Sequence, residues 1–467
     1  MFERCAAITI TNTELNIQPN SVVQYVADNA DHNLRTIDGK DTFHGMGIIA
    51  AITPSLPQKH NCVPRRKVTD EELLNYGQIK IHSHDINQNI LSKITYQKLL
   101  PLSTEDATAN LDLLWMSSCL FRLPRPGWQG YMQFVMETKK HPGKSEVVFL
   151  PLIDLSASSD SCVFSTLTFL AEQAIRYNKT PIVTFDQPLY WKAMMIIANS
   201  DDSSPIRQTV LKLGGFHTLM SFIGCIGHIM EELGLQDLLN LVYATNTVPH
   251  MLSGKAISRA IRGLFLVESA VMFVLINTDI QRDHLEPTIV DSEVIPDSEK
   301  SYYSLTSSDL EELNVLFHRM LDVNAINNYE EIDKSKAFKK LQLLVETKIA
   351  TFKLSRTGSV WIQLLNMFRI LKTFIKAERT GNWELHLQTT MEMLPFFAAA
   401  GHSNYLKSSY VYVQNMMSLK ETNPLLYHLF QSGHHVIRRS DQYWAGLSSD
   451  LVIEQDLMRT MKSSGIL

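Results

Sequence analysis

Three acidic positions, far apart in the chain, are placed where carboxylates could hold divalent metal ions. Asp28 and Asp31 follow an apolar run, Asp186 closes a short β-branched run, and Glu454 lies in an amphipathic segment near residue 467. Phosphodiester cleavage by the two-metal route needs carboxylates that hold two ions about 3.5–4 Å apart. Magnesium prefers carboxylate and water oxygens as ligands. The residues therefore predict a Mg²⁺ or Mn²⁺ site for phosphodiester chemistry.

Each of these acids also has a plainer explanation. Asp186 precedes Gln-Pro at the expected start of a helix, where an aspartate commonly caps the backbone. Asp31 lies in an expected turn, where acids are common. The sequence does not decide whether Asp28 or Asp31 is the first ligand. The order of Asp28 (or Asp31), Asp186 and Glu454 along the chain is what favours the metal site.

His217 follows a Gly-Gly pair at an expected strand end. One interpretation is a contact to a scissile phosphate or to a group beside the metal. The other is a structural histidine at a strand–helix junction. The remaining histidine groups, His82-Ser-His84-Asp85 and His434-His435, have no third and fourth ligand at helical or hairpin spacing, so zinc is not expected there.

The elements that must position these residues begin with a hairpin. Two apolar runs, 22–31 and 42–50, flank a turn at Asp38-Gly39, which is a strong hairpin signal. Further strands are expected at 78–82, 146–153, 182–186 and 209–213. Helices are expected at 106–122, 162–177, 188–198 and 214–233. Trp128 is expected to be exposed, in a loop at 124–130. A hairpin meander followed by alternating helices and strands is typical of a ribonuclease H-like α/β core. A generic three-layer α/β domain would have a similar order of elements.

From about residue 235 the pattern is helical. Apolar residues recur at helical spacing over 252–278, 308–321, 335–377, 382–399, 403–418 and 424–431, and again over 450–462. We therefore expect three parts: an α/β core with a mixed sheet at 1–234, a large all-α insertion at 235–440, and a C-terminal helix at 441–467 that returns to the core with Glu454.

The composition indicates a globular protein, with 45% hydrophobic and 19% charged residues. A net charge of −5 argues against a generally basic nucleic-acid coat but allows a local basic groove. Arg438-Arg439 beside Trp444 is the best candidate, because charge next to an aromatic ring can hold a backbone and stack a base.

The five cysteines are widely spaced, which favours reduced thiols in an intracellular protein. No signal peptide is evident in the first 20 residues. The most apolar stretch, 264–276, carries Glu268 and is shorter than the roughly 20 residues that a span needs, so no membrane association is expected.

Several longer motifs resemble the repeated, transposon-like reading frames of invertebrate genomes. They are Val26-Ala-Asp-Asn-Ala-Asp-His-Asn33, Thr42-Phe-His-Gly-Met-Gly47, Thr184-Phe-Asp-Gln-Pro-Leu189, Leu213-Gly-Gly-Phe-His-Thr-Leu-Met220, Gly381-Asn-Trp-Glu384, Asn404-Tyr405 and Trp444–Gln455. Such frames resemble DDE-type transposases, with a ribonuclease H-like core and a helical insertion like that of the hAT superfamily.

The resemblance implies a nuclear, DNA-binding strand transferase or nuclease. Asp28, Asp186 and Glu454 would be the three acids, with Mg²⁺ or Mn²⁺ as cofactor, and His217 would match a histidine after the last core strand. No N-terminal DNA-binding module is recognisable and the chain stops soon after the final helix, which leaves a truncated or inactive copy as an expectation. The alternative function is a catalytically dead interaction module, and a homo-oligomer is compatible with either.

Overall fold

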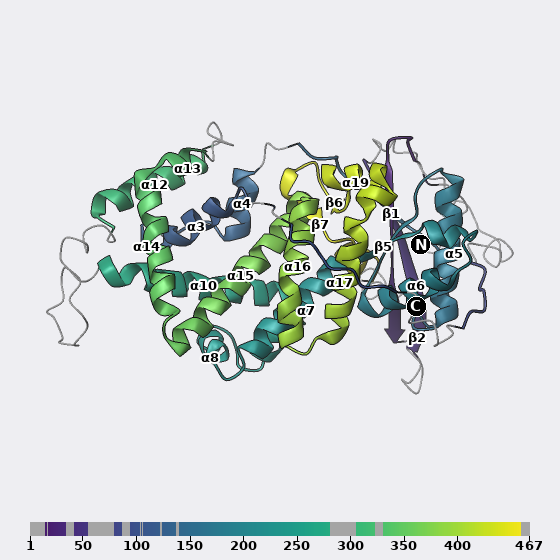
Figure 1. The fold of residues 1–467 in the computed structure, drawn as a ribbon, viewed down its shortest axis with the longest axis horizontal. Helices are drawn as coiled ribbons and strands as arrows, with labels where there is room; N and C mark the ends of the chain where they lie inside the picture. The colour runs from purple at the N-terminus through teal and green to yellow at the C-terminus, as the bar shows by residue number, and fades with distance from the viewer. Residues whose placement is uncertain are drawn as a thin grey trace. The chain divides into compact units, whose positions relative to one another are not determined.

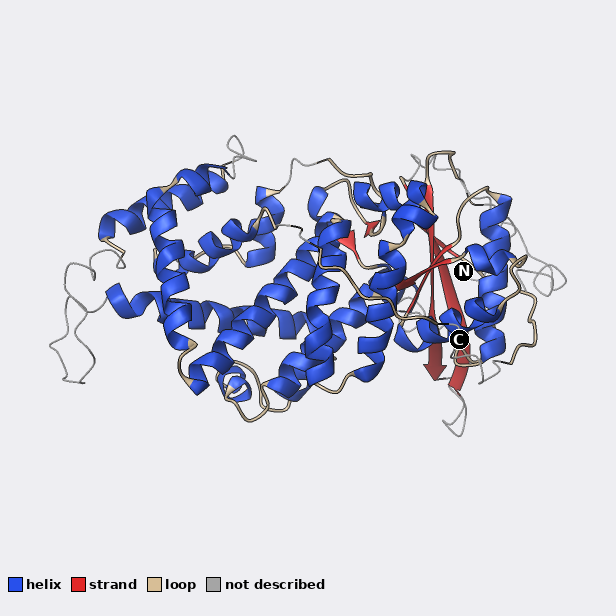
Figure 2. Ribbon diagram, viewed as in Figure 1, coloured by secondary structure: helices blue, strands red, loops and turns tan. Residues whose placement is uncertain are grey.

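The computed structural model describes residues 15, 17–33, 42–54, 79–85, 94–102, 104, 106–121, 124–136, 140–280, 305–322 and 330–458. The chain forms two compact units. The first, called the sheet unit, comprises residues 1–102, 141–221 and 374–467; the second, called the helical unit, comprises residues 103–140 and 222–373. Figure 1 shows the elements along the chain, and Figure 2 shows that helices predominate.

The sheet begins with the expected hairpin. Strands β1 (Val22–Asn33) and β2 (Thr42–Thr53) pair antiparallel over their full length, with Tyr25 opposite Ala50 and Asp28 opposite Gly47. Both strands are rich in β-branched and small apolar residues, which suits a buried pleated surface. The turn at Asp38-Gly39 lies outside the described residues.

Three short strands complete a five-stranded mixed sheet of order β3-β2-β1-β4-β5. Strand β3 (Glu146–Phe149) pairs antiparallel with β2, while β4 (Ile182–Phe185) runs parallel to β1 and β5 (Val210–Leu213) runs parallel to β4. The fold is therefore mixed α/β, with β1 at the centre of the sheet.

The strand expected at 78–82 is wrong, because residues 79–85 are irregular in the structure. The backbone N–H groups of His82 and His84 donate to the hydroxyls of Ser165 and Ser161, at 2.8 and 2.9 Å. Both serines lie on helix α5 (Asp160–Arg176). The backbone donors of this segment are thus satisfied by a helix surface instead of a neighbouring strand.

The two faces of β1 are buried against different layers, as the alternation of strand side chains requires. Val23, Tyr25 and Ala27 join a core with α5 and helix α6 (Gln187–Asn199). Val26 and Ala30, on the opposite face, pack with α20 (Ser449–Ile453) and the π-helical turn η8 (Glu454–Met458). Asp28 has the same parity as Val26, so it faces the final helical segment.

Most of the other regular elements described in the sheet unit are helices. They include the start of α7 (Gly215–Ile229), the end of α15 (Arg356–Thr380), α16 (Trp383–Ala399), α17 (Ser403–Met417), α18 (Leu419–Thr422) and α19 (Pro424–Leu429), followed by the turn η6 (Phe430–His434). Strands β6 (Ile437–Arg438) and β7 (Gly446–Leu447) then form a two-stranded ladder. The helices expected at 382–399 and 403–418 are confirmed.

The helical unit consists of α3 (Ala109–Ser117), α4 (Trp128–Val135), α8 (Leu235–Asn240), α9 (Val248–Leu252), α10 (Ile257–Ile280), α12 (Ser307–Met320), α13 (Glu330–Lys334), α14 (Lys336–Phe352) and most of α15. Helices α14 and α15 were expected as one segment at 335–377.

The expected division of the chain at residues 234 and 440 differs from the observed units. Residues 103–140 belong to the helical unit, and residues 374–440 belong to the sheet unit.

The expectation of an exposed Trp128 in a loop is wrong. Trp128 opens α4 and is buried. Its indole N–H donates to Asp112 at 2.7 Å, and its ring meets Phe265 edge to face at 5.1 Å. The Pro and Gly residues before Trp128 predicted a loop. Trp128 is instead the first residue of the following helix, and its ring is part of the core.

Helix α10 is longer and more apolar than the sequence suggested. Residues 257–277 would be long and apolar enough to cross a membrane, on length and composition alone, but 56% of the most apolar window is buried inside the protein. Within the helical unit, Glu268 of this helix forms a buried ion pair with Lys372 at 2.6 Å. The buried part of this helix belongs to the core of the helical unit.

Candidate active site

Asp28, His217 and Glu454 meet on the face of the sheet that α20 and η8 cover. One ligand atom of each residue lies within 4.8 Å of the ligand atoms of the other two. Asp28 comes from the central strand β1, His217 from the first turn of α7, and Glu454 from the start of η8. Residues nearly the whole chain apart are therefore assembled into one group of possible metal ligands.

Asp28 is the most buried member of this group. Its Oδ1 accepts the backbone N–H of Asn29 at 2.8 Å, whereas Oδ2 is buried without a hydrogen-bond partner. Burial, followed by the charge of Asp186, raises the pKa of Asp28 to about 7. A buried carboxylate oxygen without a donor is costly unless a cation or proton compensates it, so this atom fits a metal ligand.

His217 is held by Asp450, a residue that the sequence analysis did not single out. Asp450 accepts the backbone N–H groups of Phe216 and His217 at 3.0 and 2.9 Å, and one of its oxygens lies 3.0 Å from Nδ1 of His217. The carboxylate thus satisfies the first free N–H groups of α7 and fixes the orientation of the ring.

The same contact sets the charge of the imidazole. Burial alone lowers the pKa of His217, but the hydrogen bond and charge of Asp450, with the charges of Asp28 and Asp186, raise it to about 9. His217 is therefore a cation at neutral pH, and a protonated ring cannot ligate a metal ion. The pKa of Asp450 is lowered by the same ion pair, against the effect of its burial.

Gly214 and Gly215 explain why the Gly-Gly pair precedes His217. A Cβ at Gly214 would lie 2.3 Å from Oδ2 of Asp450, and one at Gly215 would lie 3.0 Å from the Ser448 hydroxyl. Neither glycine has a positive φ, so the requirement is space. The pair lets α20 approach the end of β5 closely enough for its aspartate to cap α7.

Asp186 lies beside the group but outside its 4.8 Å limit. Its Oδ1 accepts the N–H of Leu189 at 3.1 Å, so the expected helix-capping role is real. The parallel pairing of β1 with β4 sets Val26 opposite Thr184, which brings Asp186 level with Asp28. Burial raises the pKa of Asp186, and the charges of Asp450 and Glu454 contribute to that shift. Asp186 therefore acts on the site electrostatically while it caps α6.

The backbone of Asp31 pairs with His44 in the hairpin, but its side chain lies outside the described residues. Tyr405, on α17, is a neighbour that sequence reasoning missed. Burial and then the charges of Asp186, Asp450 and Asp28 raise its pKa. The only sequence signal for Tyr405 was its place in one of the transposon-like motifs.

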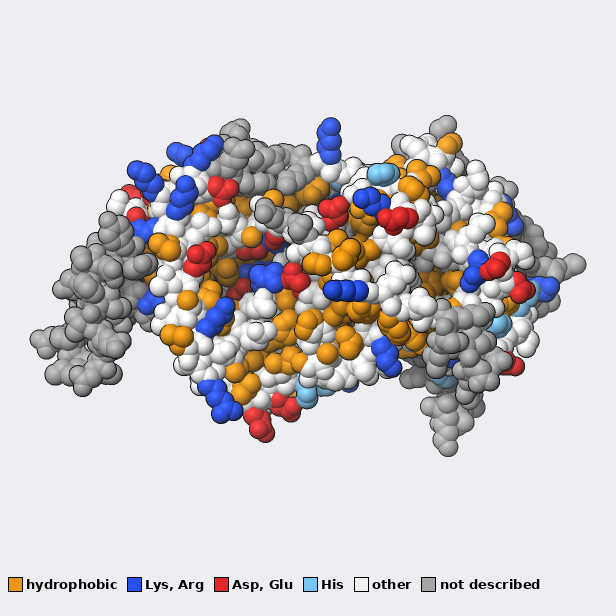
Figure 3. Space-filling model, viewed as in Figure 1, with side chains coloured by type: hydrophobic (Ala, Val, Ile, Leu, Met, Phe, Trp, Pro, Cys, Tyr) orange, Lys and Arg blue, Asp and Glu red, His pale blue; other side chains and the backbone are white. Residues whose placement is uncertain are grey.

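The basic groove expected at Arg438-Arg439 beside Trp444 is wrong. Arg438 is buried, and its guanidinium donates to the carbonyls of Thr380 and Tyr443 at 2.5 and 2.7 Å. Arg439 pairs with Asp456, and Trp444 is 5% exposed. On the face shown in Figure 3, basic and acidic side chains are interspersed. These arginines hold the C-terminal segment in place.

Cys119, Cys162 and Cys225 are free thiols, and the last two are buried. Burial raises the pKa of Cys162 to about 11 and of Cys225 to about 12, so both are neutral thiols at pH 7. The positions of Cys5 and Cys62 lie outside the described residues.

Residues 127–467 match the model of a family described as Domain of unknown function (DUF8702). The chain belongs to this family. The match covers every candidate residue except Asp28 and Asp31, which precede it. No curated protein and no solved structure matches the chain.

Proposed function

We propose that this protein is a DDE-type nuclease or strand transferase of transposon origin that acts on DNA through a ribonuclease H-like core. The observation that carries the proposal is the meeting of Asp28, His217 and Glu454 within 4.8 Å, with Asp186 beside them. A chance set of capping and turn acids has no reason to converge from β1, the end of β4 and η8.

The topology supports the same proposal. An antiparallel meander of β1, β2 and β3 is followed by two helix–strand units, and the sheet order is β3-β2-β1-β4-β5. The first acid lies on the central strand, the second follows the adjacent strand, and the third comes from a later helical segment. This is the arrangement of acids that the ribonuclease H-like layout requires.

Asp28 and Glu454, with Asp186 at their side, would hold Mg²⁺ or Mn²⁺. Oδ2 of Asp28, which is buried without a hydrogen-bond partner, and the carboxylates of Glu454 and Asp186 are oxygen donors of the kind that a hard cation prefers. When bound, such an ion activates a water or hydroxyl and stabilises the leaving oxygen. His217, a cation oriented by Asp450, is suited to contact a phosphate oxygen.

The test is calorimetric titration of Mn²⁺ into the wild-type protein, Asp28→Asn, Asp186→Asn and Asp456→Asn. Asp456 is a matched control, because it lies two residues after Glu454 but pairs with Arg439. We expect saturable binding in the wild type and the control, lost in Asp28→Asn and weakened at least tenfold in Asp186→Asn.

Cleavage of linear and branched DNA by the same proteins then follows, with loss of activity in Asp28→Asn and Asp186→Asn. The absence of Mn²⁺ binding in a folded wild-type protein would refute the metal site. The chain would then be a transposon-derived interaction module.

A further inference from the structure

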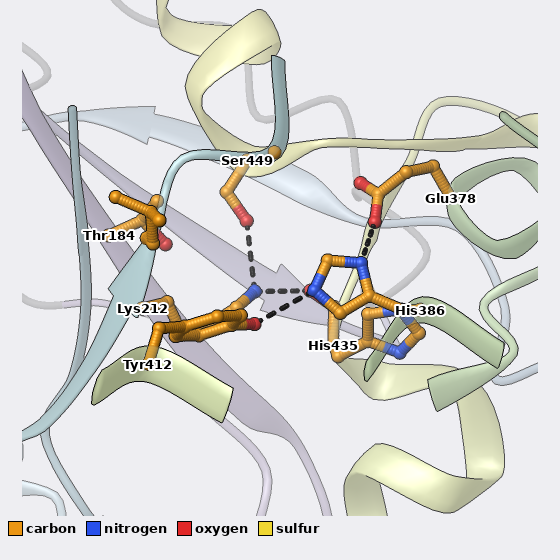
Figure 4. Close-up of a pocket in the computed structure, with 9 residues that line it drawn as sticks. Thr184, Lys212, Glu378, His386, Tyr412, His435 and Ser449 are labelled. Atoms are coloured by element: carbon orange, nitrogen blue, oxygen red, sulfur yellow. Dashed lines mark hydrogen bonds and ion pairs between the residues drawn. The ribbon is translucent and has the colours of Figure 1, made fainter. Parts of the chain in front are cut away.

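We propose that Glu378, His386 and His435 form a second metal site, for a zinc-class transition metal, inside the sheet unit. One ligand atom of each residue lies within 4.8 Å of those of the other two, and all three side chains are buried. Figure 4 shows them around a small cavity. The site does not depend on the function proposed for Asp28, Asp186 and Glu454.

The cluster contains buried polar atoms that a metal could bind. Both ring nitrogens of His435 are buried without a hydrogen-bond partner. Oε1 of Glu378 and Nδ1 of His386 lie 2.6 Å apart as an ion pair. An unsatisfied buried polar atom costs about 1–3 kcal/mol, so the two nitrogens of His435 beside this ion pair indicate a missing partner.

The opposite atoms of the same side chains are already held. Nε2 of His386 lies 2.9 Å from the Tyr412 hydroxyl, and Oε2 of Glu378 accepts a short hydrogen bond from Ser448. Metal-ligating histidines and carboxylates are characteristically oriented by such outer partners. Tyr412 and Ser448 thus leave one nitrogen of His386 and one oxygen of Glu378 facing the cavity.

His435 is suited to be the third ligand. It is 2% exposed, and neither of its ring nitrogens has a hydrogen-bond partner. Two imidazoles and one carboxylate are a common zinc set.

Lys212 argues for a transition metal and against magnesium. Its ammonium lines the cavity and donates to Gln24 and Ser449 at 2.8 and 3.3 Å, and to the carbonyl of His435. This positive charge opposes any second cation. Imidazole nitrogens suit zinc, cobalt or nickel, whereas Mg²⁺ prefers oxygen ligands and keeps its water.

Such a metal would join three segments of the C-terminal region: the end of α15, the first turn of α16 and the residue after η6. The sequence analysis considered His434-His435 as metal ligands but did not expect zinc there, because no further ligand lies at helical or hairpin spacing. The cavity is lined by buried residues of β4, β5 and α17 as well, so we assign the site a structural role.

The experiment is titration of Co²⁺ into the chelator-treated full-length protein, followed by visible absorption. Four-coordinate cobalt absorbs far more strongly than the six-coordinate ion, so the signal reports a four-coordinate site, and the variants identify the residues that form it. The variants are His435→Ala, Glu378→Gln, Asp28→Asn and His434→Ala. His434 is a matched control, because its ring contacts Ser432 and the Leu429 carbonyl outside the cluster.

We expect one equivalent of strongly absorbing Co²⁺ in the wild type, Asp28→Asn and His434→Ala, and loss of that signal in His435→Ala. Glu378→Gln replaces His435→Ala if the latter fails to fold. A folded wild type without the signal, or a signal that persists in both cluster variants, overturns the proposal. Loss of the cobalt absorption in Asp28→Asn alone would also overturn the proposal, since the ion would then be bound by Asp28, Asp186 and Glu454.

Discussion

At the scale of single residues, the candidate site contains two ionisable groups, Asp28 and His217. Burial disfavours the charged form of each. Asp28 has a pKa raised to about 7, and His217 has one raised to about 9. Without a metal ion, the carboxylate of Asp28 ionises at a cost in folding free energy. The cation of His217 is instead stabilised by Asp450, so the two residues have opposite effects on stability as pH changes.

Asp28→Asn should stabilise the metal-free protein at pH 8. The folded-state pKa of Asp28 is raised above 3.8, so its ionisation destabilises the fold progressively from about pH 4 to pH 7 and fully above that. At about 1.4 kcal/mol per pKa unit, the gain is on the order of 2–4 kcal/mol at pH 8 and smaller at pH 5. Urea unfolding in EDTA measures it. A loss of stability at pH 8 would contradict the burial of an unpaired carboxylate.

Asp450→Asn should lower the pKa of His217 from about 9 toward its ordinary value of 6.5, as read from an NMR pH titration of the ring. A raised histidine pKa adds stability that is fully present below pH 6.5 and lost as pH rises through 9. The stability gap between wild type and variant should therefore narrow from pH 6 to pH 10. Asp456→Asn, which removes the partner of Arg439, should leave the His217 titration unchanged.

At the scale of elements, the site depends on how closely α20 approaches the start of α7. Asp450 can cap α7 only because Gly214 has no side chain. Gly47 of β2 has a similar role, since a Cβ there would lie 2.9 Å from Leu457 of η8. These two glycines allow the C-terminal segment to lie directly on the sheet.

Gly214→Ala should destabilise the protein by about 1–3 kcal/mol, because the added methyl would lie 2.3 Å from an Asp450 oxygen and push the carboxylate away from His217. The pKa of His217 should also fall, because the displaced carboxylate of Asp450 no longer stabilises the protonated ring. The matched control is Gly130→Ala in α4, where nothing lies within 4 Å and alanine is expected to add about 0.5–1 kcal/mol. Thermal unfolding compares the two; equal effects would contradict the steric explanation.

The regular elements could be predicted from the sequence where local pattern decides them. The β1–β2 hairpin, α5, β4, α6 and β5 follow from apolar periodicity and turn residues. The strand at 78–82 and the exposed Trp128 were wrong because tertiary partners, Ser161, Ser165 and Asp112, decide those segments. Local propensity is a weak guide when distant groups satisfy the backbone or bury a ring.

For the candidate site, the order of acids and the Gly-Gly-Phe-His motif led to Asp28, Asp186, His217 and Glu454. Asp450 could not be predicted, because its role depends on the approach of α20 to Gly214 in three dimensions. The cluster of Glu378, His386 and His435 was missed for the same reason. Side chains that meet only after the chain has folded leave no spacing signal.

At the scale of the whole molecule, the sheet unit is built from three separate stretches of chain, and the acid site draws on each. Asp28 belongs to residues 1–102, Asp186 and His217 to residues 141–221, and Glu454 to residues 374–467. A ligand that binds only when these stretches are assembled stabilises the assembled state. Metal binding should therefore be visible as a change in the stability of the protein, independently of any DNA substrate.

Mg²⁺ should raise the midpoint of thermal unfolding of the wild-type protein at pH 8, with about 2.7 kcal/mol of stabilisation at a hundred times its dissociation constant. The increase should shrink below pH 7, because Asp28 is then protonated in the metal-free protein and the ion must displace that proton. Asp28→Asn should abolish the increase and Asp456→Asn should retain it. His435→Ala should retain it as well, since Mg²⁺ favours the carboxylates over the imidazoles. An increase that survives in Asp28→Asn would place the ion elsewhere in the protein and remove the basis for metal-dependent chemistry at Asp28, Asp186 and Glu454.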